Sequence, residues 1–149
     1  MKPTDLHIVF NDTTNRLKLF DATGRLVFAC EARNDAVAGP GFGHNGDCPR
    51  GEFVLGSPRK KGTAAFGAWF IPILDGGTRG PMAKFGRAGI GIHGGGSGLK
   101  DPFAPEQGWV KTHGCLRVQN RELAVLTDKV KGCLAAGGSV QLSVSGQSS

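Results

Sequence analysis

The sequence predicts one β-rich domain of mixed α+β class with a single main helix. Short alternating apolar runs recur about every ten residues near the N-terminus, one later segment has helical spacing, and the 149 residues contain no repeat or low-complexity linker. We expect a sandwich-like or mixed sheet over residues 6–144 and a frayed tail at 145–149.

The opening strands are predicted by alternation and by the turns between them. Residues 6–10, 16–20 and 26–30 are rich in Val, Leu, Ile and Phe with a near period-two alternation, and polar stretches at 11–15 and 21–24 separate them. These runs indicate a meander of strands.

The middle of the chain is rich in glycine and less regular. We expect a loop at 38–51, a strand at 51–56, a strand at 64–74 interrupted by Pro72, and a strand at 87–93 that ends at His93.

Asn120 begins the predicted helix, because asparagine caps well and Leu123, Leu126, Val130 and Leu134 recur at helical spacing. Gly137 and Gly138 end the helix, and a last strand is expected at 139–144.

The charge balance favours an anionic partner. Lys and Arg number 18 against 12 Asp and Glu, a net charge of +6. The one contiguous basic run, at 59–61, has no interleaved aromatic residues, so we expect a solvated turn there and no nucleic-acid partner. No apolar stretch has the length of a membrane span or a Sec signal, so we expect neither. The expectation is then export by another route or a cytoplasmic pool that precedes export.

Cys115 has the surroundings of a reactive thiol. It lies between cations, shortly before the predicted helix, and both features favour the thiolate. Gly114 permits a sharp backbone turn, so the amides of Gly114 and Cys115 are candidate oxyanion donors. His93, at a strand end, is the candidate base.

The run Ile92-His93-Gly94, followed by Thr112-His113-Gly114-Cys115-Leu116-Arg117, resembles the signature of the L,D-transpeptidase catalytic domain, the YkuD-like family. The residues around Pro49 and at 16–20 also resemble that family, and the resemblance covers residues 6–144. It implies a β-rich fold with the helix after the nucleophile.

The resemblance also implies the catalytic roles. Cys115 is the acylated nucleophile, His93 the general base, and His113 orients or polarises the thiol. Gly94 offers the carbonyl that steadies His93, and Gly114 completes the catalytic set.

Four residues are expected to contact substrate. Arg117 is suited to bind a carboxylate in bidentate fashion, and His44 is expected to line the substrate groove. The chain has no Tyr, so any role of an active-site tyrosine is either empty or filled by Trp109, Thr112 or the backbone. Residues 94–108 with Trp109 are expected to form a lid.

The implied reaction needs no metal or organic cofactor. The thiolate attacks the peptide bond before the terminal D-alanine of a peptidoglycan tetrapeptide stem and leaves a thioester. A second stem then gives a cross-link, a free D-amino acid gives exchange, and water gives carboxypeptidase activity. The reaction takes place in the periplasm or cell wall.

Three other uses of the cysteines stay open. His44, Cys48, His113 and Cys115 are an alternative set of zinc ligands, although their spacing is unusual for one metal. Two of Cys30, Cys48 and Cys133 form a disulfide if the protein works outside the cytoplasm. Otherwise these three are buried small apolar residues.

Two functional alternatives also remain. In the first alternative, the chain has the same fold but is an interbacterial effector toxin that acts on periplasmic peptidoglycan and has a secretion-system or immunity partner. In the second alternative, the chain is a non-catalytic module that binds the cell wall, and Cys115 has only a structural role. The sequence indicates no oligomeric state.

Overall fold

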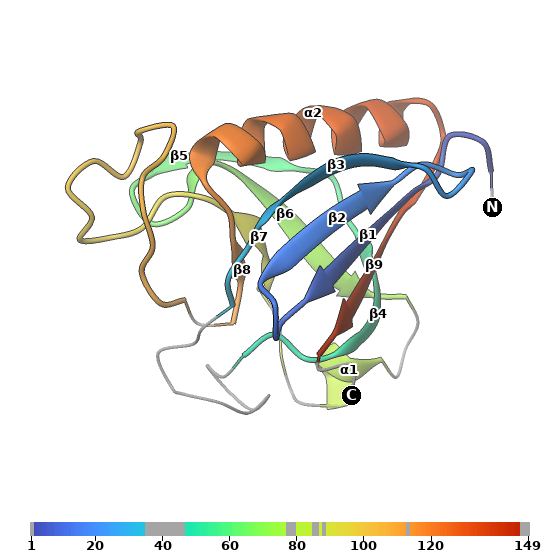
Figure 1. Cartoon of the computed structure of the whole chain (residues 1–149), viewed down its shortest axis with the longest axis horizontal. Coiled ribbons are helices and arrows are strands. Elements are labelled where there is room, and N and C mark those ends of the chain that lie inside the picture. Colours follow the sequence, from blue (N-terminus) through green and yellow to red (C-terminus); the bar gives the residue numbers. More distant parts are fainter. Residues whose placement is uncertain are drawn as a thin grey trace.

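One curled mixed sheet forms the body of the molecule, and helix α2 (Asn120–Ala135) lies across one side of it (Figure 1). The computed structural model describes residues 2–34, 47–76, 80–84, 87, 89–112 and 114–146. The predicted mixed α+β fold with one main helix is confirmed, as a single curled sheet.

The sheet of the described residues has nine strands, and a short helix precedes the seventh. The elements are β1 (Leu6–Asn11), β2 (Arg16–Phe20), β3 (Leu26–Glu31), β4 (Gly51–Leu55), β5 (Arg59–Thr63), β6 (Gly67–Asp75), α1 (Pro81–Lys84), β7 (Gly91–His93), β8 (Leu116–Arg117) and β9 (Val140–Ser145).

The strand order is β3-β2-β1-β9-β4-β6-β7-β8, with β5 paired to β6. β1 and β9 are parallel, as are β7 and β8, and the remaining pairs are antiparallel. The parallel pair β7 and β8 forms one end of the sheet and carries the candidate catalytic residues.

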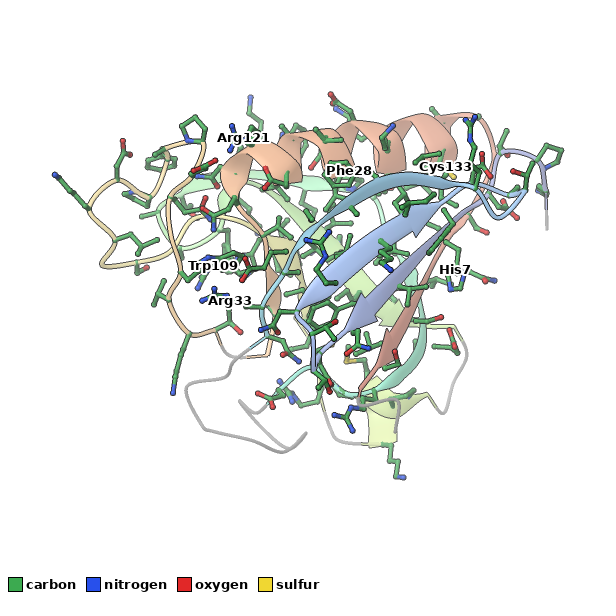
Figure 2. The ribbon with its side chains drawn as sticks, in the orientation of Figure 1. His7, Phe28, Arg33, Trp109, Arg121 and Cys133 are labelled. Atoms are coloured by element: carbon green, nitrogen blue, oxygen red, sulfur yellow. The ribbon has the colours of Figure 1, made fainter. Side chains whose placement is uncertain are left out.

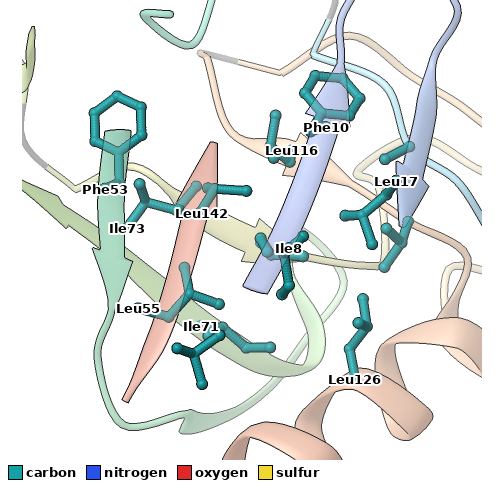
Figure 3. Packing of buried hydrophobic residues seen from close by; sticks show 14 of the residues in the cluster. Ile8, Phe10, Leu17, Phe53, Leu55, Ile71, Ile73, Leu116, Leu126 and Leu142 are labelled. Atoms are coloured by element: carbon teal, nitrogen blue, oxygen red, sulfur yellow. The ribbon is translucent and has the colours of Figure 1, made fainter. Parts of the chain in front are cut away.

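A continuous apolar core lies between the sheet and α2 (Figure 3). The alternation seen in the sequence gives β2 its pattern of exposed and buried side chains, with Leu17 and Leu19 inside. From α2, the side chains of Leu123, Leu126 and Val130 are buried at helical spacing. Other core residues are Ile8, Phe10, Phe53, Leu55, Ile71, Ile73, Leu116 and Leu142.

Several strand predictions need correction. Residues 59–61 belong to strand β5, which pairs with β6 across a hairpin, and do not form a turn. Pro72 does not interrupt β6, which runs on to Asp75. On one edge the partner of β6 changes from β5, paired as far as Phe70, to β4, paired from Ile73, and on the other edge β7 pairs as far as Pro72. The strand expected at 87–93 covers only Gly91–His93.

The ends of α2 differ slightly from the prediction. Gln119 is the N-cap residue and Asn120 the first helical residue, whose side chain bonds elsewhere. At the other end Gly137 has φ +83 and donates its N–H to Leu134, as the predicted glycine stop requires. β9 extends to Ser145, one residue into the expected tail.

The short α1 and β8 have no periodicity that the sequence could reveal. Most of the predicted loop at 38–51 lies outside the described residues. None of the helices in the described ranges is long and apolar enough to cross a membrane.

Candidate active site

The pairing of β7 with β8 places Cys115 and His93 on one face of the sheet. Ile92 is opposite Leu116 and His93 is opposite Arg117 in a parallel register. Cys115 immediately precedes β8, so strand alternation directs its side chain to the same face as that of His93. Ile92 and Leu116 point to the other face, into the core.

A tight turn delivers Cys115 to this position. The Thr112 hydroxyl donates to the Cys115 carbonyl at 2.9 Å and accepts the Gly114 N–H at 3.0 Å. Gly114 has φ +103, a conformation that residues with a Cβ rarely adopt. Thr112 therefore acts on the backbone of the turn, and its hydroxyl already holds one of the two expected oxyanion donors.

The Cys115 thiol is 7% exposed, and this burial raises its pKa. A backbone hydrogen bond from Gly91 and the charges of Arg117 and Arg87 act in the opposite direction and favour the thiolate. The Sγ atom lies 3.7 Å from the Gly89 carbonyl oxygen. The Cys115 thiol is thus protonated at rest, and attack by its sulfur would require a base.

His93 is the candidate for that base. Its Nδ1 lies 2.8 Å from the Gly94 carbonyl oxygen, and because a carbonyl only accepts, Nδ1 carries the proton. Nε2 therefore carries the lone pair. The role predicted for Gly94, to steady His93 through its carbonyl, is compatible with this contact and stays a prediction.

Two phenylalanine rings surround the imidazole. Phe66 meets His93 edge to face, with 4.8 Å between ring centroids, and Phe70 stacks at 6.0 Å. Burial lowers the pKa of His93 to about 4, a shift that Arg117 adds to and the Gly94 hydrogen bond opposes. His93 is therefore neutral at pH 7 and able to accept a proton.

Arg117 is 5% exposed and binds backbone carbonyls. Its guanidinium donates to Gly94 at 3.4 Å, to Ala65 at 3.3 Å, and to Val110 through a short hydrogen bond. It thus joins the hairpin turn before β6 to the segment before the nucleophile. These described contacts are those of a structural anchor, and carboxylate binding by Arg117 stays a prediction.

A buried amide network fastens the loop at 95–108 to the start of α2. The Asn120 side chain accepts from the Gly95 N–H at 2.9 Å and donates to the carbonyls of Pro102 and Ala104. Gln107 donates to the Gly95 carbonyl at 3.2 Å and accepts the Asn120 N–H at 2.7 Å. The segment expected to act as a lid is therefore tied to the helix.

Trp109 follows this loop and stacks against Arg33, whose guanidinium carbon lies 4.4 Å from the ring centroid (Figure 2). Both residues line a cavity of about 160 Å³ together with Val110 and Lys111. Since Arg117 binds the carbonyls of Val110 and Lys111, this cavity adjoins the segment that carries the nucleophile.

Two predicted site residues, His113 and His44, lie outside the described residues. Cys30, Cys48 and Cys133 are free thiols, so the alternative of a disulfide among them is wrong for this structure. Within the ranges described, no three His, Cys, Asp or Glu side chains could hold a metal ion. The zinc alternative depends on the two undescribed histidines.

Sequence reasoning missed five residues of this site. Phe66 and Phe70 were assigned only to a strand, although Phe70 stands directly opposite His93 in the register. The sequence predicts Asn120 only as a helix cap, Gln107 only as part of the lid at 94–108, and Arg87 only as the start of the strand at 87–93. The signal that could have indicated the role of Gln107 is its position as a polar residue inside a glycine-rich loop.

Comparison with known proteins identifies a family. The model of the L,D-transpeptidase catalytic domain, YkuD, matches residues 5–141 of the chain. No curated protein sequence matches the chain significantly.

Three solved structures share the fold. A mutant of the helical cell shape determining protein Pgp2 from Campylobacter jejuni superposes with a TM-score of 0.69 at 15% identity, over 97% of this chain and 48% of that one. Bd1075 from Bdellovibrio bacteriovorus gives 0.63 at 15%, over 93% and 46%. An L,D-transpeptidase from Stackebrandtia nassauensis gives 0.51 at 14%, over 97% and 58%. The chain thus spans about half the length of the first two structures.

Proposed function

Because the chain belongs to the YkuD family of L,D-transpeptidase catalytic domains, we propose that it is a cysteine acyltransferase or peptidase acting on peptidoglycan tetrapeptide stems. One observation carries the proposal: the β7 and β8 register directs the Cys115 thiol and the His93 imidazole to one face of the sheet. Family membership supports a function on peptidoglycan, and hence action in the cell wall or periplasm.

The proposed reaction begins with proton transfer within the substrate complex. Burial raises the pKa of Cys115 and lowers that of His93, so both groups are neutral at rest. His93 Nε2 accepts the thiol proton as Sγ attacks the carbonyl carbon before the terminal D-alanine. The positive charges of Arg87 and Arg117 stabilise the developing thiolate.

The tetrahedral intermediate then requires a donor for its oxyanion. The Gly114 N–H is bonded to Thr112, so the Cys115 N–H is our remaining candidate from this turn. Collapse of the intermediate breaks the C–N bond, and the His93 imidazolium returns its proton to the departing amine of D-alanine. Cys115 is left as a thioester.

An amine of a second stem, the amine of a D-amino acid, or water then attacks the thioester. The three acceptors give a cross-link, exchange or hydrolysis, and in each case Cys115 leaves as the thiolate and recovers a proton.

Release of D-alanine from a tetrapeptide-bearing muropeptide tests the proposal. We expect release by the wild type, none by Cys115→Ala, and a rate at least about 100-fold lower for His93→Ala. Cys48→Ala is the matched control, since Cys48 is also a buried thiol and electrostatically close to Cys115. Release that persists in Cys115→Ala would overturn the mechanism.

A further inference from the structure

Strand β5 places two cations on the face of the sheet that carries the candidate base. Arg59 is opposite Phe70 on β6, and Phe70 is opposite His93 on β7. Directly paired residues project to the same face, so Arg59, Phe70 and His93 form one row across three strands. At 4.7–4.9 Å between neighbouring strands, Arg59 lies roughly 10 Å from His93 along this row.

Lys61 lies beside the same row. Its Nζ is 5.8 Å from the centroid of the Phe70 ring and 5.9 Å from that of Phe66. These two rings are the ones that contact the His93 imidazole. Cation–π attraction holds the ammonium group against these two aromatic rings.

The two cations are available to a ligand. All five residues of β5 are exposed. None of the ion pairs found among the described residues includes Arg59 or Lys61. Exposed cations that form no ion pair retain their attraction for an incoming anion, and that attraction extends over a Debye length of about 8 Å at physiological salt.

Lys60 points away from this face. It is opposite Trp69, which packs against the apolar core on the side of α2, and Lys131 of α2 lies 4.5 Å from the Trp69 ring. The same strand thus holds two cations beside the active-site row and one on the opposite face.

We propose that Arg59 and Lys61 form a carboxylate-binding wall of the active site and select peptide stems that carry a free carboxylate. This inference rests on the function proposed above. A charged contact made equally in the bound substrate and the transition state strengthens binding without changing the chemical step. The wall therefore acts on Kd and KM, with kcat unchanged.

The test measures binding separately from turnover. Isothermal titration calorimetry measures the Kd of a soluble tetrapeptide-bearing muropeptide for the Cys115→Ala protein. The same measurement is made on this protein with Lys61→Gln, Arg59→Gln or both added. Lys60→Gln is the matched control, because it removes one charge from the same strand on the other face. Two further ligands have an amide in place of either the terminal D-alanine carboxylate or the side-chain carboxylate.

We expect each single variant to raise Kd about threefold and the double variant about tenfold, with Lys60→Gln unchanged. Amidation of the recognised carboxylate should weaken binding to the Cys115→Ala protein. The Kd of the Cys115→Ala protein and that of the double variant should then be the same for this amidated ligand. The ligand that shows this behaviour identifies the recognised carboxylate.

Any one of three results would contradict the proposed role of Arg59 and Lys61. The double variant binds as tightly as its parent, or Lys60→Gln weakens binding as much as Lys61→Gln, or neither amidated ligand abolishes the effect of the variants. If the folded Cys115→Ala protein binds no stem at all, the proposed function fails, and the wall fails with it.

Discussion

The side-chain oxygen of Asn120 accepts a hydrogen bond of 2.9 Å from the backbone N–H of Gly95. Gly95 follows Gly94, whose carbonyl oxygen fixes the proton of His93 on Nδ1. A Cβ at Gly94 would lie 2.2 Å from the same Asn120 oxygen, so the asparagine packs directly on this backbone. The first residue of α2 thus positions the base without touching it.

Asn120→Ala is expected to lower both stability and rate. It removes three described side-chain hydrogen bonds and leaves the Gly95 N–H without its partner, so the free energy of unfolding should fall by about 2–4 kcal/mol. Urea denaturation measures this change. Gln141→Ala, at an exposed residue of β9, is the control and should change it by less than about 0.5 kcal/mol.

The same variant distinguishes positioning from mere stability. With the base misplaced, kcat should fall about tenfold or more while KM changes little at temperatures where the variant is folded. Unaltered kcat in a destabilised Asn120→Ala protein would show that the network does not act through His93.

Arg117→Lys is expected to be damaging although it keeps the positive charge. One ammonium cannot reproduce a guanidinium that reaches the carbonyls of Gly94, Ala65 and Val110. The free energy of unfolding should fall by about 2 kcal/mol or more in urea denaturation. If Arg117 instead binds a substrate carboxylate, the variant would keep its stability and lose affinity only for stems with that carboxylate.

Gly114→Ala tests the turn before the nucleophile. At φ +103 a Cβ introduces backbone strain of about 1–3 kcal/mol, which either destabilises the fold or moves the thiol. Alkylation of Cys115 by iodoacetamide, followed by mass spectrometry, should be altered relative to wild type. Gly132→Ala, in α2 where a Cβ meets nothing within 4 Å, is the control. Equal alkylation and stability in the two variants would contradict the role given to Gly114.

Burial of neutral His93 predicts a specific acid sensitivity. The pKa of about 4 in the folded protein lies below the ordinary 6.5, so the unfolded chain binds a proton in this interval that the folded chain does not. Stability should therefore fall as the pH decreases from about 6.5 to 4, by up to roughly 3 kcal/mol. His93→Gln should remove this part of the loss in urea denaturation, whereas His7→Gln should retain it. A pH profile shared by wild type and His93→Gln would contradict this explanation.

The sequence predicted those parts of the fold that have a regular pattern. β1, β2 and α2 repeat their apolar residues at the periods of a strand and a helix, and burial of one face confirms each of them. The third expected strand is confirmed by its pairing with β2. β5 escaped prediction because its residues are all exposed and three are basic, so no alternation was visible. β5 is a strand because the short turn that joins it to β6 lets the two segments pair as a hairpin.

The site was predictable only where chemistry requires a particular residue beside the nucleophile. Cys115, His93 and the Gly94 carbonyl were named from a local motif, and the structure shows the Gly94 contact with His93. Gln107 and Asn120 act through backbone groups distant in sequence, which a motif does not reveal. The surroundings of Arg117 likewise arise from tertiary packing.

The central claim is that Cys115 is acylated by a tetrapeptide stem with His93 as base. The measurement is the intact mass of wild type, Cys115→Ser and His93→Ala proteins after mixing with tetrapeptide-bearing muropeptide, with free D-alanine quantified in the same samples. The account predicts an acyl adduct on wild-type Cys115 with release of D-alanine, no adduct on Cys115→Ser, and slow adduct formation on His93→Ala. A folded wild-type protein that forms no adduct and releases no D-alanine would contradict it.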